Sequence, residues 1–490
     1  MTATSTADLD QIRSDYKSLR NSLSGSAQAY LEPGKPVAIG TAPGRLDVMG
    51  GIADYSGATV LEATIGARTT VMVQPREDGL IRVLTVGPEA GPLDGATFEL
   101  PTATFWRHET PSTHGTLVAP EDLRNTIGKE HRWASYVVGV WYILISEGIA
   151  PSLPGANVIV HGTVPLGAGV ASSAALEVAT MRAVTTAFGI DLDGFRIAAL
   201  CQLVEHRVAG APCGIMDQVT CTLGQSGRLL ALRCQPHDIL GHVPLPAGAT
   251  VLGLDSGVKH AVGGERYPRV RTAAFMGREM LIRGINGVQI DVPADHLCNI
   301  IPEQFRTVRQ HLPVSITGGD FLDRYGSHRD LATHIDRNTR YRVRGATEHA
   351  VTEQSRVIRF RDALGEAMST TKERIREAAL IRAGRQMFGS HRSYSRNCGL
   401  GAPETDMIVN LARNEGPENG LYGAKITGGG SGGTVAILAE ANAGGILSPR
   451  ANLAVSRVRD AFGRSTGRPP RIIDGTSQGA MLLPAIIEVW

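Results

Sequence analysis

The sequence carries almost no excess charge. Lysine and arginine number 49 against 47 aspartate and glutamate residues in a chain of 490, which gives a formal net charge of +2. This near-balance provides no whole-chain field that would attract nucleic acid or an anionic membrane surface. We therefore expect small-molecule partners, no nucleic acid and no membrane, while nothing in the composition indicates an oligomeric state.

Cysteine pairs and long hydrophobic runs are also missing. The six cysteines form no C-x-x-C pair and no zinc-finger spacing, a pattern that favours reduced, mostly buried thiols. No segment reaches the ~18 uninterrupted apolar residues that a membrane span needs. Residues 1–35 are polar and mixed in charge, unlike a secretory signal. The expected location is the cytoplasm.

The chain is long enough for two or three domains and has no internal repeat. Short apolar runs predict strands over 36–40, 59–74, 158–160, 229–233 and 250–254, with a long loop over 41–57. Helical spacing predicts helices over 132–148, 174–188 and 195–207, another that begins near Met216, and a long one that begins near Arg361. The tryptophan and tyrosine side chains of helix 132–148 are interpreted as core.

A glycine loop over 165–173 is the strongest chemical signal. It reads Pro-Leu-Gly-Ala-Gly-Val-Ala-Ser-Ser and stands between a predicted strand and a predicted helix. Glycines let the backbone approach a ligand, and the helix points its first N–H groups at the loop, a construction that binds phosphate. Ser172 and Ser173 favour phosphate and Mg²⁺ over the alternative, a tight turn without a ligand. No G-x-x-x-x-G-K-[ST] sequence is present, so this is not a P-loop enzyme.

Two further segments are rich in glycine. Segment 42–57 places Arg45, Asp47 and Asp54 among four glycines, and a salt-bridged surface turn is its alternative interpretation. Segment 423–433 reads Gly-Ala-Lys-Ile-Thr-Gly-Gly-Gly-Ser-Gly-Gly, a glycine density that an ordinary strand does not tolerate. Apolar strands predicted on both sides argue against a flexible linker there.

Two carboxylates, Glu205 and Asp217, flank a short loop that contains Gly210, Pro212 and Gly214. Alone, each acid would more often cap a helix or form a salt bridge. Beside a phosphate loop, the pair supplies a metal ligand and an acid that orients an acceptor hydroxyl, which phosphoryl transfer requires.

In this order and at these separations, the three glycine segments resemble motifs I, II and III of the GHMP kinases, and the first is similar to the galactokinase form. Segments 201–218, 255–280 and 390–437 resemble L-arabinokinases more closely. The resemblance implies an α+β fold with an N-terminal domain like ribosomal protein S5 domain 2 and a ferredoxin-like C-terminal domain. We expect an extension over 1–35, a domain for ATP and sugar over 36–245, and a second domain over 246–490 with an insertion at about 281–354.

The resemblance also implies roles for individual residues. Asp217 resembles the catalytic aspartate near the anomeric hydroxyl of the sugar, and Arg45 resembles its arginine partner. Ser173 and Glu205 resemble Mg²⁺ ligands. The loop implied to wrap the ATP phosphates consists of Leu166, Gly167, Ala168, Gly169, Val170, Ala171, Ser172 and Ser173. The residues implied to line the sugar site are Asp54, Gly51, Ile52, Tyr267, Gly428, Gly429 and Gly430.

One departure from the galactokinase pattern bears on the substrate. Galactokinases show Glu-His after the motif I glycine, where this chain has Gly51 and Ile52. That pair lies where the C6 hydroxymethyl of galactose is held, a group that L-arabinopyranose lacks. Loss of the acceptors would disfavour galactose, since a buried hydroxyl would go unpaired. A second departure is Ala171, where many galactokinases carry a third serine.

These features predict a sugar 1-kinase that uses ATP and Mg²⁺ to convert L-arabinose into L-arabinose 1-phosphate and ADP. Asp217 would orient or deprotonate the sugar hydroxyl. Because the adjacent Arg45 lowers its basicity, Asp217 would be a weak base that chiefly positions this hydroxyl. A galactokinase, or a kinase of another pentose or a sugar acid, is the nearest alternative. A sugar sensor without turnover is a further one, against which the presence of Asp217, Arg45, Ser173 and Glu205 argues.

Overall fold

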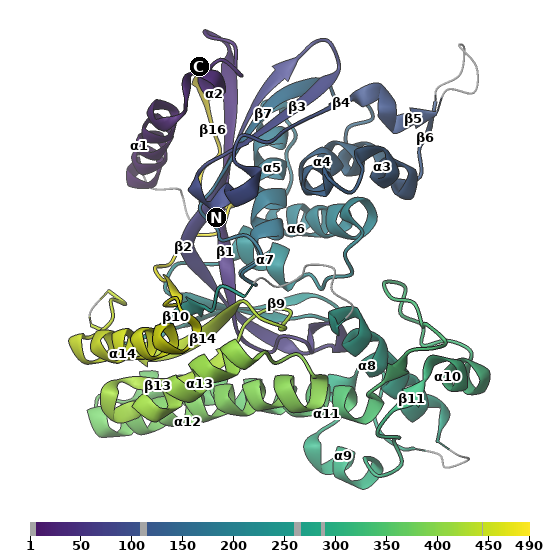
Figure 1. Cartoon of the computed structure of the whole chain (residues 1–490), viewed down its shortest axis with the longest axis vertical. Helices are drawn as coiled ribbons and strands as arrows, with labels where there is room; N and C mark the ends of the chain where they lie inside the picture. The colour runs from purple at the N-terminus through teal and green to yellow at the C-terminus, as the bar shows by residue number, and fades with distance from the viewer. Residues whose placement is uncertain (1–5, 108–114, 259–265, 286–289, 443) are drawn as a thin grey trace.

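The computed structural model describes residues 6–107, 115–258, 266–285, 290–442 and 444–490. Two β-sheets lie one above the other in the view of Figure 1, each with helices packed on it. The α+β class expected from the sequence is confirmed. Within the described ranges, no helix combines the length and the apolar character needed to cross a membrane.

The first sheet consists of long strands rich in β-branched and apolar residues, which suit a pleated, buried surface. Its order is β16 (Ile486–Val489), β1 (Pro36–Met49), β2 (Thr59–Arg76), β7 (Gly155–Gly162), β3 (Leu80–Val86) and β4 (Thr97–Pro101). The first part of β2 also pairs with β8 (Arg228–Arg233), and β8 pairs with β9 (Asp238–Pro244). Because β16 pairs with β1, the end of the chain returns to the first sheet. The division into two domains at residue 245 stays a prediction.

The loop expected over 41–57 is wrong in its first half, because β1 continues as a strand to Met49. The β1–β2 ladder shows register shifts between Pro43 and Arg45 and between Asp47 and Met49, and these bulges absorb the irregular residues while pairing continues. The chain turns later, through the 3₁₀ helix η1 (Asp54–Ser56). Arg45 and Asp47 therefore stand on a rigid strand instead of a loop.

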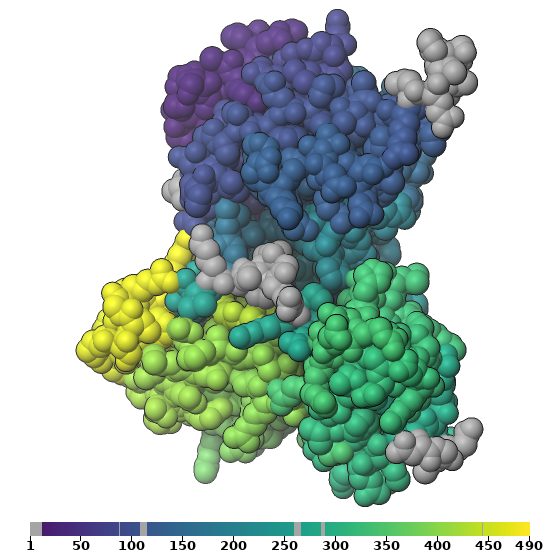
Figure 2. Space-filling view, turned by 45° about the vertical axis from the view of Figure 1, so that its right-hand side comes forward, coloured from purple at the N-terminus to yellow at the C-terminus, as the bar shows by residue number. Residues whose placement is uncertain are grey.

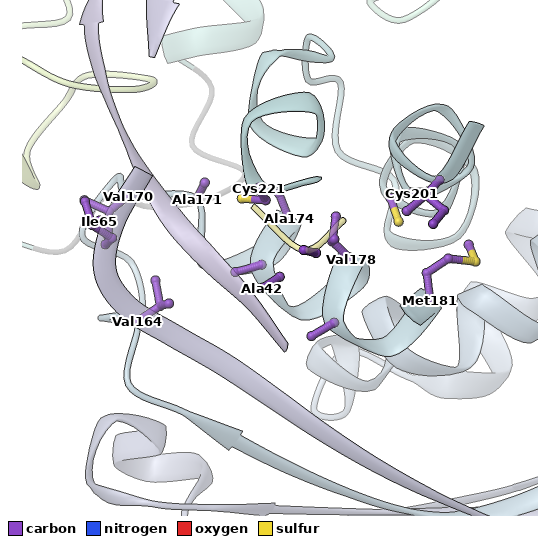
Figure 3. Packing of buried hydrophobic residues seen from close by; sticks show 14 of the residues in the cluster. Ala42, Ile65, Val164, Val170, Ala171, Ala174, Val178, Met181, Cys201 and Cys221 are labelled. Atoms are coloured by element: carbon purple, nitrogen blue, oxygen red, sulfur yellow. The ribbon is translucent and has the colours of Figure 1, made fainter. Parts of the chain in front are cut away.

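The two faces of the first sheet are covered by different helices, as the alternation of side chains along a strand requires. Ala42 packs with α5 (Ser172–Ala187), where Figure 3 shows it opposite Ala174 and Val178. Ile39 instead packs with α1 (Thr6–Ser22) and Trp490. The remaining helices of the α5 layer are α3 (Pro120–Ile127), α4 (Ser135–Ser146), α6 (Gly194–Leu203) and α7 (Met216–Leu223). The short helix α2 (Gly25–Gln28) follows α1.

The second sheet has the order β13 (Leu421–Ile426), β14 (Thr434–Glu440), β10 (Ala249–Asp255) and β15 (Arg471–Ile473), all antiparallel. Its helices are α11 (Val343–Ser369), α12 (Glu373–Ser393), α13 (Pro403–Glu415) and α14 (Pro449–Thr466). The long helix expected to begin near Arg361 begins eighteen residues earlier, at Val343. It ends at Ser369, and a second helix follows from Glu373.

The described residues of the stretch expected as an insertion form a lobe, drawn in green at the lower right of Figure 2. After α8 (Arg266–Arg283) it contains α9 (Pro302–Val308), β11 (Ile316–Thr317), α10 (Gly318–Tyr325) and β12 (Arg340–Tyr341). Leu297, Phe305, Leu312 and Phe321 are buried in one hydrophobic cluster with residues of α8 and α11. This lobe therefore packs into a hydrophobic cluster that it shares with α8, the helix that carries the sugar-site candidate Tyr267, and with Ile52 and Tyr55.

Candidate active site

A cavity of about 470 Å³ brings segments of both sheets together. Residues from β1, from the glycine loop that precedes α5, from the segment between α6 and α7, and from the start of α8 line it, and Gly429 reaches it from the loop between β13 and β14. The predicted site residues on its wall are Arg45, Asp54, Leu166, Gly167, Gly169, Val170, Ala171, Ser172, Ser173, Glu205, Asp217, Tyr267 and Gly429. Those that do not line it are Gly51, Ile52, Ala168, Gly428 and Gly430.

The loop before α5 is a left-handed turn that ends at the N-terminus of a helix. Gly167, Gly169 and Ala171 have φ values of 72°, 74° and 59°, so two of the three strained positions are glycines, as such backbone favours. α5 begins at Ser172, and both Ser172 and Ser173 line the cavity, so the N-terminus of this helix forms part of its wall. A helix start of this kind favours a bound anion such as phosphate.

The same loop is held from both sides. In Figure 3, Val170 and Val164 lie beside Ile65 of β2. On the other side, the N–H and the hydroxyl of Thr434 both donate to the carbonyl of Ala168, at 2.9 Å each. This contact explains why Ala168 is turned away from the cavity: its backbone carbonyl is the anchor for the third glycine segment.

Arg45 and Asp217 form the central ion pair. Nε and Nη2 of Arg45 donate to Oδ1 of Asp217 at 3.0 and 2.7 Å, and Nη1 donates to the carbonyl of Gly169 at 2.8 Å. Glu62 on β2 adds a second carboxylate, with its Oε2 3.3 Å from Nε. Burial lowers the pKa of Arg45, but the charges of Asp217 and Glu62 outweigh it and hold the pKa above its ordinary value. The guanidinium therefore stays charged although it is buried.

Glu205 stands on a single turn of π-helix, η5 (Val204–Ala209), that continues α6. Its Oε1 accepts from the Ser173 hydroxyl at 3.2 Å, and its Oε2 accepts from Nε2 of Gln218 at 2.6 Å. Burial, and next the charge of Asp217, raise the pKa of Glu205 to about 7. The Gln218 amide also donates to Glu177, whose pKa burial raises well above its ordinary value.

The side-chain oxygens of Ser173 and Glu205 fit a magnesium ion that also binds phosphate. A hydroxyl and a carboxylate are hard oxygen donors, and Mg²⁺ in nucleotide sites is held by one or two protein ligands plus phosphate and water. Nowhere in the described ranges do three or more His, Cys, Asp or Glu side chains form a group that could hold a metal alone. Ser173 and Glu205 suit the partial set that Mg²⁺·ATP needs.

Asp54 is a buried acid on the wall of the cavity. It is 2% exposed, and its Oδ1 has no hydrogen-bond partner among the described residues. Burial raises the pKa of Asp54 to about 6, against the opposing effects of the Tyr55 N–H and Arg271. A Cβ added to Gly214 would lie 1.8 Å from its Oδ2, so the glycine leaves room for the carboxylate. A buried, unpaired acceptor beside a cavity is suited to a polar ligand.

Gly51 and Ile52 lie behind the cavity wall. A Cβ on Gly51 would stand 2.1 Å from Oδ2 of Asp47 and 2.4 Å from the hydroxyl of Tyr394, so no side chain fits there unless these two groups move. Ile52 is 2% exposed and has a φ of 60°, an uncommon conformation for a β-branched residue. The space that a residue 51 side chain would need is taken by Asp47 and Tyr394.

Asp47 and Tyr394 belong to a buried polar cluster that the sequence did not reveal. Nζ of Lys425 donates to Oδ2 of Asp47 at 2.8 Å, and both side chains are fully buried. The Tyr394 hydroxyl donates to the same oxygen at 3.1 Å and contacts the Gly428 carbonyl at 3.3 Å. Tyr394 stands on another turn of π-helix, η7 (Tyr394–Cys398). The cluster links β1, β13 and the third glycine segment.

One interpretation of the aromatic residues is wrong. Trp141 of the predicted helix 132–148 is fully buried in the core, but Trp133 and Tyr136 line the cavity together with Val86 and Leu93. Helical spacing alone could not separate them, since residues that face a pocket and residues that face a core share the same apolar stripe. The sequence reasoning therefore missed the apolar end of the site.

Comparisons with known proteins agree with this geometry. The family model for the GHMP kinases N terminal domain matches residues 135–225, and the galactokinase galactose-binding signature matches residues 27–75. The chain is 33% identical to L-arabinokinase of Arabidopsis thaliana over 90% of its own length, and it spans 46% of that protein. It is 32% identical to galactokinase of Bos taurus, with 86% of this chain and 89% of that protein covered.

Among solved structures, galactokinase of Lactococcus lactis in complex with galactose superposes with a TM-score of 0.69 at 20% identity, and covers 94% of this chain and 98% of that one. Mevalonate kinase of Methanococcus jannaschii reaches a TM-score of 0.52 at 13% identity, with coverage of 90% and 98%. The family model and the curated relatives thus define an ATP-dependent small-molecule kinase. The chain belongs to the GHMP kinase family, as a sugar kinase of the galactokinase and L-arabinokinase type, and the resemblance seen in the sequence is confirmed.

The buried ion pair between Lys425 and Asp47 predicts a large stability effect. Replacement of one partner of a buried pair leaves an uncompensated charge, so Lys425→Met should lower the free energy of unfolding by about 3 kcal/mol. Chemical denaturation measures this loss. The double variant Asp47→Asn, Lys425→Met should regain part of it, because neither side chain then keeps a charge. Arg306→Met, which breaks an exposed pair with Glu303, is the control, and an equally small change in Lys425→Met would contradict the prediction.

Proposed function

We propose that this kinase transfers the γ-phosphoryl group of ATP to the anomeric hydroxyl of L-arabinose, which gives L-arabinose 1-phosphate and ADP. The observation that carries the proposal is the position of Asp217: Arg45 fixes it in the same cavity as the glycine loop 166–173 and the unpaired carboxylate oxygen Oδ1 of Asp54. One cavity thereby offers a place for a nucleotide, a reacting hydroxyl and a polar sugar.

The nucleotide fits the cavity in one direction. The apolar end around Trp133, Tyr136 and Leu93 suits a purine base. From there the loop 166–173 leads to the start of α5, where N–H groups and two serine hydroxyls suit the phosphates. Ser173 and Glu205 would hold Mg²⁺, which neutralises phosphate charge when it is bound. The γ-phosphate then lies toward Arg45 and Asp217.

Asp217 and Arg45 would act chiefly by position and charge. Both hydrogen bonds from Arg45 go to Oδ1 of Asp217, which leaves the other carboxylate oxygen for the sugar hydroxyl. Arg45 is charged and buried, so its field acts strongly on the negative charge of the transferring group. Loose phosphoryl-transfer transition states depend mainly on such positioning and electrostatic stabilisation.

The preference for L-arabinose rests on the corner at Gly51 and Ile52. The sugar would lie against Asp54, Tyr267 and Gly429, which line the cavity. Gly51 and Ile52 carry no polar side chain and lie behind the cavity wall. There, Oδ2 of Asp47 accepts from Lys425 and Tyr394, and its Oδ1 accepts from the Gly51 N–H, so this corner presents no side-chain acceptor to a hydroxymethyl group. A pentopyranose loses nothing there, whereas a hexose would bury an unsatisfied hydroxyl. The similarity to L-arabinokinase supports the same sugar.

Galactose phosphorylation is the second candidate. Galactokinases are matched over most of their own length, whereas the chain spans about half of the plant L-arabinokinase. The ring hydroxyls of the two sugars have the same configuration, so Asp54 and Tyr267 would serve either one. The choice between L-arabinose and galactose therefore depends on the residues near the C6 position, Gly51 and Ile52.

An assay of ADP release with L-arabinose and D-galactose tests the proposal. We expect kcat/KM for L-arabinose to exceed that for D-galactose by roughly tenfold or more, the scale of one unsatisfied hydroxyl. Asp217→Asn should lose at least about 10²-fold in kcat with either sugar. A preference for D-galactose would support the sugar kinase activity but contradict the specificity argument based on Gly51 and Ile52. No turnover with either sugar would point to an untested sugar or to a sensor.

The raised pKa of Asp54 predicts how sugar binding changes with pH. Its pKa of about 6 means that the carboxylate takes up a proton as the pH falls through 6. A protonated carboxyl accepts sugar hydroxyls less well, so the KM for the sugar should rise between about pH 7.5 and pH 5.5. Steady-state kinetics at saturating ATP measure this. Asp54→Asn should show a high sugar KM without the pH dependence, and a wild-type sugar KM that is constant over this range would refute the assignment.

A further inference from the structure

A buried ion pair connects the insertion lobe to the sugar end of the cavity. Arg271 lies on α8 one turn after Tyr267, and it is 8% exposed. Its Nε and Nη2 donate to Oδ2 and Oδ1 of Asp330, at 2.8 Å each. Asp330 lies between α10 and β12, fifty-nine residues further along the chain. A bidentate, largely buried pair of this kind is both strong and geometrically specific.

Asp330 is itself fixed by a turn of the lobe. The hydroxyl of Thr333 donates to its Oδ2 at 2.7 Å, and the N–H of Ala332 donates to its Oδ1 at 3.3 Å. The N–H of Asp330 donates to Nδ1 of His328 at 3.1 Å, and His328 is 3% exposed beside Phe275 of α8. The turn 328–333 thus holds the carboxylate in one place before it meets the arginine.

The other side of the Arg271 guanidinium contacts the sugar site. Nη1 donates to the carbonyl of Cys213 at 3.3 Å, in the loop that leads from Glu205 to Asp217. The guanidinium also lies 5.5 Å from the centre of the Tyr55 ring, and Tyr55 packs edge-on against Tyr267 at 6.1 Å. Arg271 therefore connects α8 and the loop 209–215 with η1, the turn that carries Asp54.

The charges in this group support one another. Burial alone would raise the pKa of Asp330, but the hydrogen bonds and charge of Arg271 outweigh it, so the pKa lies below its ordinary value. The positive charge of Arg271 also opposes the effect of burial on the pKa of Asp54. Without Asp330, Arg271 would lose the partner that keeps its guanidinium beside Cys213 and Tyr55.

We propose that Asp330 is a positioning residue for sugar binding, and that the turn 328–333 of the insertion acts through Arg271 to hold Asp54, Tyr267 and the loop 209–215 in place. The proposal rests on the sugar site of the proposed function. It assigns the lobe to the acceptor end of the cavity and leaves the ATP end, around loop 166–173, independent of it.

Hydrogen exchange of the protein without ligand tests the positioning role whatever sugar the kinase uses. In Asp330→Asn, amides of the loop 209–215 and of residues 52–57 should exchange at least roughly tenfold faster, since they lose a constraint. Amides of residues 166–173 should not change. Asp323→Asn is the matched control, because Asp323 forms an exposed ion pair with Arg337 in the same lobe, at 2.7 Å. Unchanged exchange at both sugar-side segments would overturn the proposal.

Kinetics then test the functional consequence. With the better of L-arabinose and D-galactose as substrate, Asp330→Asn should raise the KM for the sugar by roughly tenfold or more, as misplacement of a binding group does. The KM for ATP should stay within about twofold of the wild-type value. Equal changes in both constants would indicate a merely structural role and overturn the proposal.

A second variant keeps the test decisive if Asp330→Asn does not fold. Thr333→Val removes the hydroxyl that fixes Asp330 but keeps the shape of the side chain. This variant should change amide hydrogen exchange and the KM for the sugar in the same directions as Asp330→Asn, by a smaller factor. No change in Thr333→Val would then overturn the proposal. Failure of the proposed function would show in the wild-type enzyme, as no turnover of either sugar, whereas failure of the positioning role shows only in the differences between variants.

Discussion

The site depends on one buried positive charge. Arg45 stands on β1, and its guanidinium meets Asp217 from α7, the Gly169 carbonyl from the phosphate loop and Glu62 from β2. A buried charge is tolerated only when partners surround it. Because those partners come from separate segments, their arrangement around Arg45 brings the phosphate loop and the aspartate into one place. The third glycine segment closes over them, and a Cβ on Gly428 would lie 2.8 Å from the Gly169 carbonyl.

Much of this arrangement was predictable from local sequence. The loop 165–173 before α5, Glu205 near the end of a helix and Asp217 at the start of the next are all patterns of adjacent residues, and the structure places them around one cavity. The extent of β1 was not predictable, because glycines and a proline suggested a loop while the pairing with β2 maintains a strand. Tertiary pairing overrides local propensity in such a segment.

The remaining contacts around the site had no local signal. Lys425 and Asp47 are 378 residues apart, and Arg271 and Asp330 are 59 apart, so only the fold brings each pair together. Glu205 and Tyr394 each stand on a turn of π-helix, which adds one residue to a helical turn and rotates the side chain relative to an ideal helix. Such turns recur at functional sites, yet their sequences read as ordinary helix. Each π-helical turn ends at a glycine in the left-handed conformation, Gly210 after the turn of Glu205 and Gly399 after the turn of Tyr394.

The charges beneath the cavity also constrain one another. Asp47 and Glu62 are opposite each other in the β1–β2 ladder, so their side chains share a face. Two cations, Arg45 and Lys425, face three carboxylates, those of Asp47, Glu62 and Asp217. Burial, and next the charge of Asp47, raise the pKa of Glu62 well above its ordinary value, and neither of its oxygens has a hydrogen-bond partner among the described residues. Arg45 and Lys425 therefore donate hydrogen bonds to Asp217 and Asp47, whereas Glu62 meets Arg45 only as an ion pair at 3.3 Å.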